Sequence, residues 1–133
     1  MTLSGRLHLW RPLLRWGASV GVAGLLSVAA VQAREQAPFL PAVAVAALPA
    51  EARAVESAIR RGGPFYPKDG IVFSNRERLL PVEPRGFYRE YTVPTPGAHD
   101  RGGRRIVCGG PRTAPLACYY TANHYSSFHR ITP

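Results

Sequence analysis

Apolar and polar side chains alternate most regularly over residues 87–93, where aromatic and β-branched residues dominate. This composition predicts a β-strand, which is expected to end at Pro94 because proline cannot donate a hydrogen bond to a neighbouring strand. Successive side chains on a strand point to opposite faces of its sheet. The face that we expect to form the core carries Phe87, Tyr91 and Val93, and the other face carries Tyr88, Glu90 and Thr92.

A helical pattern lies upstream of this strand and runs from Pro49 to about Arg61. Proline is tolerated in the first turn of a helix, and the acidic Glu51 lies near the positive end of the helix dipole. Gly62 and Gly63 are expected to end the helix, because glycine readily adopts the left-handed conformation of a C-cap. Apolar residues three and four positions apart predict one buried stripe, made of Ala52, Val55, Ala58 and Ile59.

Short apolar segments separated by turn residues follow the helix. Residues 71–73, 104–108, 118–122 and 126–131 each have the composition of a strand, and the second and third of these are spaced like the arms of a hairpin. Residues 94–103 contain two prolines and three glycines and are expected to form a loop. One helix followed by such strands predicts an α+β fold, with the N-terminal helix packed on a small antiparallel sheet.

The first 33 residues have the pattern of an export signal. Three arginines precede an apolar run at residues 17–31, and the small side chain of Ala33 fits a cleavage site before Arg34. The run is shorter than the roughly 20 residues that span a bilayer, although an uncleaved membrane anchor is the alternative. We therefore expect a signal peptide at 1–33, a loosely ordered lead-in at 34–47 and one domain at 48–133. The mature product would be secreted or periplasmic, without stable membrane association.

The chain is strongly basic, with 17 lysine and arginine residues against 8 aspartate and glutamate residues. Cleavage after Ala33 would remove three arginines and leave 14 basic against 8 acidic residues, a formal charge of +6. Lys68 is the only lysine. Arginine can bind a phosphate through two parallel hydrogen bonds, and an excess of positive charge favours polyanionic partners.

The chain contains two cysteines, Cys108 and Cys118. An exported protein meets oxidising conditions, and the spacing suits a disulfide between the two strands of one hairpin. Free thiols are the alternative. Two cysteines without a nearby third ligand do not make a zinc site, so no metal site is expected.

Glu90 is a lone carboxylate close in sequence to several arginines. Arg101 and Arg105 are separated by an even number of positions, so their side chains would point to the same face of an extended strand. Both can then flank Glu90 if that strand pairs with the strand of Glu90. Guanidinium groups in that position could hold a phosphate, but a surface ion pair and a solvated basic loop explain the same residues. Composition does not rank the candidate histidines of the domain, His99, His124 and His129. The residues alone therefore indicate a basic exported α+β domain that could bind nucleic acid.

Five segments occur in order at compatible spacings: Phe73-Ser74-Asn75-Arg76-Glu77, Tyr88-Arg89-Glu90-Tyr91-Thr92-Val93, Thr95-Pro96-Gly97-Ala98, Arg101-Gly102-Gly103-Arg104-Arg105-Ile106 and Tyr119-Tyr120-Thr121-Ala122-Asn123-His124-Tyr125. Together they resemble the landmarks of the small secreted microbial guanyl-specific ribonucleases, the barnase-like group. The likeness runs from about Leu48 to Ile131. It implies the microbial ribonuclease fold.

The resemblance also implies roles for individual residues. Glu90 matches the general base of the family and His124 the general acid, while Arg101 and Arg105 match the arginines that hold the phosphate. The implied guanine site uses backbone N–H groups and the carboxylate of Glu77, with stacking or phosphate contact from two rings. Its residues are Phe73, Ser74, Asn75, Arg76, Glu77 and Tyr125.

These roles imply an endoribonuclease that cleaves single-stranded RNA on the 3′ side of guanosine. Cleavage would pass through a 2′,3′-cyclic phosphate, which is then hydrolysed, and would need no metal ion or cofactor. We expect a monomer, and a cell that makes it would benefit from an acidic intracellular inhibitor protein. The alternative function is a non-catalytic cationic protein that binds nucleic acid or anionic envelopes.

Overall fold

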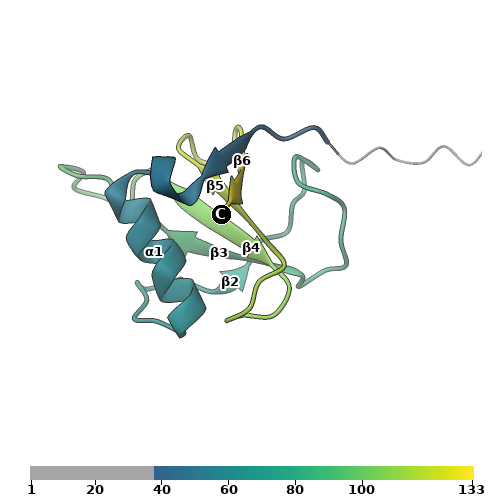
Figure 1. Cartoon of the computed structure of the whole chain (residues 1–133), viewed down its shortest axis with the longest axis horizontal. Helices are drawn as coiled ribbons and strands as arrows, with labels where there is room; N and C mark the ends of the chain where they lie inside the picture. Colours follow the sequence, from purple (N-terminus) through teal and green to yellow (C-terminus); the bar gives the residue numbers. More distant parts are fainter. Residues whose placement is uncertain (1–37) are drawn as a thin grey trace, which may run out of the picture. The chain divides into compact units, whose positions relative to one another are not determined.

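The computed structural model describes residues 38–133. The expected signal peptide and the first residues of the expected lead-in lie outside the described residues. Within the described part, the α+β prediction is confirmed: one α-helix packs on a six-stranded, mostly antiparallel sheet (Figure 1). No helix in residues 38–133 is both long and apolar enough to cross a bilayer.

The helix α1 (Ala50–Arg61) follows Pro49, and Glu51 lies in its first turn. It ends at Gly62, whose φ of 81° places it in the left-handed region that favours glycine. The Gly63 N–H then donates to the carbonyl of Ala58 at 2.8 Å and closes the last turn. The predicted apolar stripe is buried, namely Ala52, Val55, Ala58 and Ile59.

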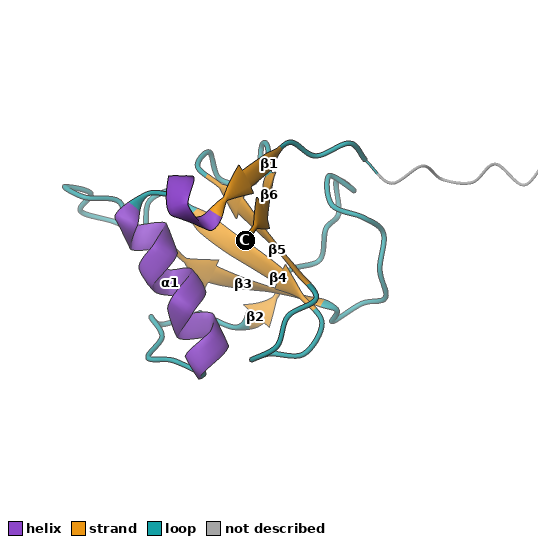
Figure 2. Cartoon of the chain, viewed as in Figure 1, coloured by secondary structure: helices purple, strands orange, loops and turns teal. Residues whose placement is uncertain are grey.

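The sheet has the strand order β1-β6-β5-β4-β3-β2 (Figure 2). Its three longest strands, β3, β4 and β5, lie side by side and antiparallel. Only the pair β1 and β6 is parallel among the described strands. The strand bounds are β1 (Ala42–Ala44), β2 (Ile71–Val72), β3 (Tyr88–Thr92), β4 (Arg105–Gly109), β5 (Ala117–Thr121) and β6 (His129–Thr132).

Residues 42–47 differ from the expectation of a loosely ordered lead-in. They form β1 and a short 3-10 helix, Val45–Ala47. The backbone of β1 pairs with β6, so that Val43 lies opposite Ile131. This pairing joins the two ends of the domain. Local composition carries no sign of it, because a three-residue strand acquires its order from a partner far away in sequence.

Apolar side chains are buried on both faces of the sheet. On the helix side, the stripe of α1 packs against Tyr91, Val93, Ile106 and Tyr120. A second cluster lies on the opposite face and includes Leu80, Tyr88, Val107, Tyr119 and Phe128. Phe87 was expected on the helix side but packs against this second cluster. The strand begins only at Tyr88, so its alternation does not extend back to Phe87.

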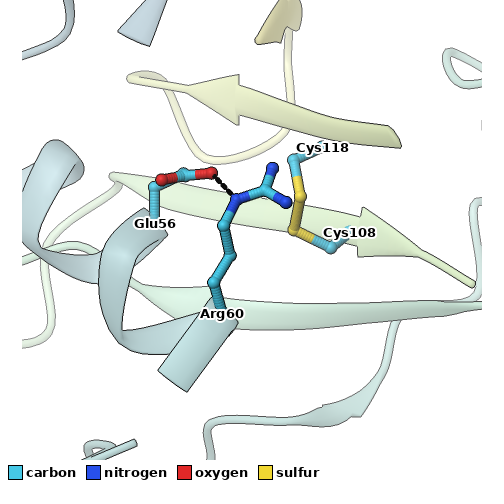
Figure 3. Close-up of a disulfide and its surroundings, with 4 residues drawn as sticks. All are labelled: Glu56, Arg60, Cys108 and Cys118. Atoms are coloured by element: carbon cyan, nitrogen blue, oxygen red, sulfur yellow. Dashed lines mark hydrogen bonds and ion pairs between the residues drawn. A yellow bond between two sulfur atoms is a disulfide. The ribbon is translucent and has the colours of Figure 1, made fainter. Parts of the chain in front are cut away.

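The predicted disulfide between Cys108 and Cys118 is present. The two cysteines lie directly opposite each other on β4 and β5, and both belong to the helix-side core. Figure 3 shows Glu56 and Arg60 extending from α1 toward this bridge, joined by an ion pair. Such a bridge fits a protein that works in an oxidising compartment.

Candidate active site

Glu90 lies on β3, on the sheet face opposite the helix. Glu90 is only 7% exposed, so the ion pair that it forms with Arg101 is buried and is not the surface pair that the sequence left as an alternative. Each carboxylate oxygen has its own donor. The guanidinium of Arg101 donates to Oε1 at 3.2 Å, and the hydroxyl of Tyr125 donates to Oε2 at 2.8 Å. These two donors compensate the carboxylate for the water that it loses on burial.

Arg101 reaches Glu90 from the loop between β3 and β4. Its Nε donates to Thr92 Oγ1 at 2.8 Å, so one guanidinium group spans two residues on the same face of β3. Gly102 allows the tight turn that follows, because it has a φ of 64° and a Cβ there would lie 2.6 Å from Thr95 Oγ1. The loop thus holds Arg101 beside the carboxylate.

Arg105 opens β4 and lies opposite Thr92 in the sheet register. It is 2% exposed, and its NH1 donates to the carbonyls of Gly102 and Arg104 at 2.9 and 2.7 Å. Its Nε is buried and has no hydrogen-bond partner within the described residues. Arg105 therefore orders the loop that carries Arg101 and keeps one charged N–H group unmatched by protein.

His124 and Tyr125 follow β5 in an unusual backbone conformation. Their φ angles are 56° and 70°, which are uncommon for residues other than glycine and each cost about 1–3 kcal/mol. The turn is held from both sides: the His124 N–H donates to Gly103 at 2.9 Å, and the Tyr125 N–H donates to the buried hydroxyl of Thr121 at 3.2 Å. The turn places the exposed His124 beside Gly103, in the loop that carries Arg101.

Tyr125 connects the parts of the site. Its hydroxyl binds Glu90, its ring centroid lies 5.0 Å from that of His124, and Arg105 Cζ lies 6.0 Å from the ring centroid. Burial, followed by the hydrogen bond to Glu90, raises the pKa of Tyr125 to about 12. The phenol therefore stays protonated and can donate at any ordinary pH. The contact with Glu90 was not predicted, because no spacing rule joins a turn residue to a strand 35 positions earlier.

A pocket of about 160 Å³ adjoins Tyr125. An apolar cavity of about 150 Å³ can hold a benzene ring, so the pocket has the scale of a planar ring. The Phe73 and Tyr125 ring centroids lie 5.1 Å apart at its wall. All six residues of the predicted guanine site line it, together with Leu79 and Phe128: Phe73, Ser74, Asn75, Arg76, Glu77 and Tyr125.

Asn75 has a structural task in this pocket. Its side-chain amide donates to the carbonyl of Leu80 at 2.9 Å, and its Oδ1 accepts the N–H of Leu80 at 3.1 Å. These two bonds close the loop of residues 75–80 on itself. The Glu77 side chain is exposed. The loop is therefore fixed by Asn75 and leaves the backbone and carboxylate beside the pocket to meet a ligand.

The structure distinguishes His124 from the two other candidate histidines by its position beside Tyr125. His129 lies on β6 opposite Tyr120, whose ring packs in the helix-side core, so His129 belongs to the strand position facing away from Glu90. His99 lies exposed in the loop after β3. Only His124 adjoins Tyr125 and the arginine loop among the three candidates.

Comparison with known proteins identifies the family. The sequence profile of a ribonuclease family matches residues 31–132. This chain belongs to that ribonuclease family. The family resemblance seen in the five ordered segments is thereby confirmed. Among its relatives is the guanyl-specific ribonuclease Sa of Kitasatospora aureofaciens, 49% identical over 90 residues that cover 67% of this chain and 91% of the relative.

Another ribonuclease of the same organism and a solved structure agree with this assignment. The guanyl-specific ribonuclease Sa3 is 50% identical over 90 residues, which cover 67% of this chain and 62% of Sa3. The structure of ribonuclease Sa2 in complexes with mononucleotides has a TM-score of 0.67 and 41% identity, and it covers 72% of this chain and 97% of Sa2. These relatives support nucleotide or RNA binding by members of the family.

Proposed function

We propose that this ribonuclease cleaves single-stranded RNA on the 3′ side of guanosine. One observation carries the proposal. A buried carboxylate, Glu90, is held by Arg101 and by Tyr125, and Tyr125 also lines a ring-sized pocket, in a chain 49% identical to a guanyl-specific ribonuclease over 90 residues. A carboxylate in that position can accept a proton from a ribose whose base occupies the pocket.

Glu90 takes the proton from the ribose 2′-OH, and the 2′-oxygen attacks the adjacent phosphorus. The bond between phosphorus and the 5′-oxygen of the next nucleotide breaks, and His124 gives that oxygen its proton. The products are a 2′,3′-cyclic phosphate and a free 5′-OH. In the second step water replaces the departed nucleotide, and the two residues exchange roles as the cyclic phosphate is hydrolysed. Tyr125 holds the Glu90 carboxylate in orientation throughout.

The two arginines stabilise the negative charge that builds on the phosphoryl oxygens. Arg101 already lies against the carboxylate, so it can bridge Glu90 and a phosphate oxygen. Arg105 is 2% exposed, so it contributes its positive charge from a position that excludes water and orders the loop that carries Arg101. This charge comes from the side chains themselves, so the proposed reaction requires no metal ion or cofactor.

Guanine recognition uses the pocket beside Phe73 and Tyr125. The backbone N–H groups of the 75–77 segment meet the O6 and N7 acceptors of the base, and the Glu77 carboxylate accepts from the N–H groups of its Watson–Crick edge. DNA lacks the 2′-OH that Glu90 must deprotonate, so DNA is bound and left intact.

The test is digestion of a mixed RNA in excess EDTA, followed by sequencing of the 3′ ends of the products. The proposal predicts cleavage with guanosine at nearly every new 3′ end. Complete loss of cleavage in EDTA, or ends without guanosine enrichment, would contradict it. Tight, salt-sensitive RNA binding without cleavage at any pH would instead favour a non-catalytic cationic protein.

The proposed function extends to the surroundings of the enzyme. It acts as a monomer after its signal peptide is removed, in the periplasm or outside the cell, where the Cys108–Cys118 bridge is stable. An acidic intracellular protein that covers Arg101 and Arg105 would protect the producing cell from RNA cleavage. Harmless cytoplasmic expression of the mature domain without any such partner would contradict the need for an inhibitor.

A further inference from the structure

A second pocket, of about 430 Å³, borders the candidate active site at Arg101. Thr92 and Pro94, at the far end of β3, also line it. The guanine pocket lies at the opposite end of this strand, because Phe73 donates its N–H to the carbonyl of Tyr88 at 3.0 Å. Residues rise about 3.3 Å each along a strand. Glu90 therefore lies between the two pockets, about 7 Å along β3 from either end.

Tyr66 and Lys68 form the outer wall of this second pocket. Tyr66 is 51% exposed, which is a large exposure for an aromatic residue in a domain with two buried aromatic clusters. Its turn is nevertheless fixed to the sheet by Asp69. One carboxylate oxygen of Asp69 accepts the Thr92 N–H at 2.7 Å, and the other accepts the Tyr66 N–H at 3.1 Å. The turn thus presents an exposed ring at a fixed position beside Arg101.

The charge of the pocket suits a nucleotide. Lys68 is the only lysine of the chain, and Arg101 contributes a second cation. Asp100 also lines the pocket, but one of its oxygens already accepts the Gly102 N–H at 2.8 Å. Exposed aromatic rings beside cations are the combination by which proteins bind single strands, with bases stacked on the rings and phosphates near the cations.

We propose that this pocket binds the nucleotide on the 3′ side of the scissile phosphate. The inference rests on the proposed function, because it takes guanine in the first pocket and the phosphate at Glu90 and the arginines as its starting point. An RNA chain that runs from the guanine pocket past Glu90 continues along β3 toward Thr92 and Pro94. The base of the next nucleotide stacks on Tyr66, and the phosphate that follows it approaches Lys68.

The test compares two substrates that each hold a single guanosine ribonucleotide in an otherwise deoxyribose chain. One is extended by two nucleotides on the 3′ side. The other is extended by two nucleotides on the 5′ side and ends in guanosine 2′,3′-cyclic phosphate, so that it too has a bond to be cleaved. Guanosine 2′,3′-cyclic phosphate, which has no 3′ nucleotide, is the internal reference. For each variant we take the ratio of kcat/KM for the extended substrate to kcat/KM for the cyclic phosphate. The ratio cancels any loss of folded protein.

Tyr66→Ala is expected to lower this ratio for the 3′-extended substrate about fivefold to tenfold, in line with the stacking energy of one base. Tyr66→Phe keeps the ring and is expected to keep the ratio. Lys68→Gln is expected to lower the ratio and its salt dependence, while Lys68→Arg restores both. A ratio unaffected by Tyr66→Ala, or lowered only for the 5′-extended substrate, would overturn the assignment of this pocket. If the unaltered enzyme cleaves neither RNA nor the cyclic phosphate, the proposed function itself fails.

Discussion

Removal of one hydroxyl, by Tyr125→Phe, tests how the site holds its carboxylate. The change leaves the ring contacts with Phe73 and His124 in place and deletes the 2.8 Å hydrogen bond to Glu90 Oε2. Hydrogen bonds to charged groups contribute about 1.5–3 kcal/mol. Arg101 still binds Oε1, so we expect a loss near the lower end, about 1.5–2 kcal/mol. In rate this corresponds to a kcat/KM that is roughly 10- to 30-fold lower.

The assay is kcat/KM for cleavage of a short RNA with one guanosine. Tyr120→Phe is the matched control, because it removes a buried phenol hydroxyl on the helix-side face. The reasoning is refuted if Tyr125→Phe keeps the kcat/KM of the unaltered enzyme, or if Tyr120→Phe lowers it to the same extent.

Two further predictions concern titration and stability. The pKa of Tyr125 is raised from 10.0 to about 12, so the phenol of the unfolded chain loses its proton at a lower pH than the phenol of the folded chain. The contribution of this proton to the free energy of unfolding is therefore complete below pH 10 and is lost as the pH rises toward 12. A difference in tyrosinate absorbance between the unaltered protein and Tyr125→Phe should therefore show a midpoint near pH 12, and a midpoint near 10 would contradict the burial. The double change Cys108→Ala and Cys118→Ala opens a loop with a sequence separation of 10 and should lower the free energy of unfolding by about 2–3 kcal/mol. RNA cleavage at 25 °C should persist, because both cysteines lie on the sheet face opposite Glu90. Thermal melting and RNA cleavage should be measured on the same sample; an unchanged melting temperature or a loss of cleavage at 25 °C would contradict the prediction.

The sequence was sufficient to predict the elements that depend on local pattern. The apolar stripe of α1, the existence of strand β3 and the hairpin that carries Cys108 and Cys118 each follow from the pattern within one segment. The pocket residues 73–77 were predicted as a set by family resemblance, and the structure gathers all of them around one cavity. Their catalytic and binding roles stay predictions until measured.

Features that depend on distant contacts could not be predicted in this way. Alternation along β3 indicated one buried face, but Tyr88 and Thr92 are also buried, because loops from both sides of the sequence cover their face. The order of β1 comes from its pairing with β6, and three small residues carry no signal for that partner. The bond between Tyr125 and Glu90 likewise depends on the path of a turn with positive φ, which no periodicity describes.

The central claim is that the carboxylate of Glu90 accepts the proton of the ribose 2′-OH. Glu90→Gln tests it most directly, since the amide has nearly the same shape but cannot act as the base. Cleavage of a single-guanosine RNA and the affinity for its uncleavable 2′-deoxy analogue should be measured side by side. The account predicts that cleavage falls by orders of magnitude while the affinity for the analogue is largely retained. Cleavage at the unaltered rate would show that another group takes the proton and would contradict the account.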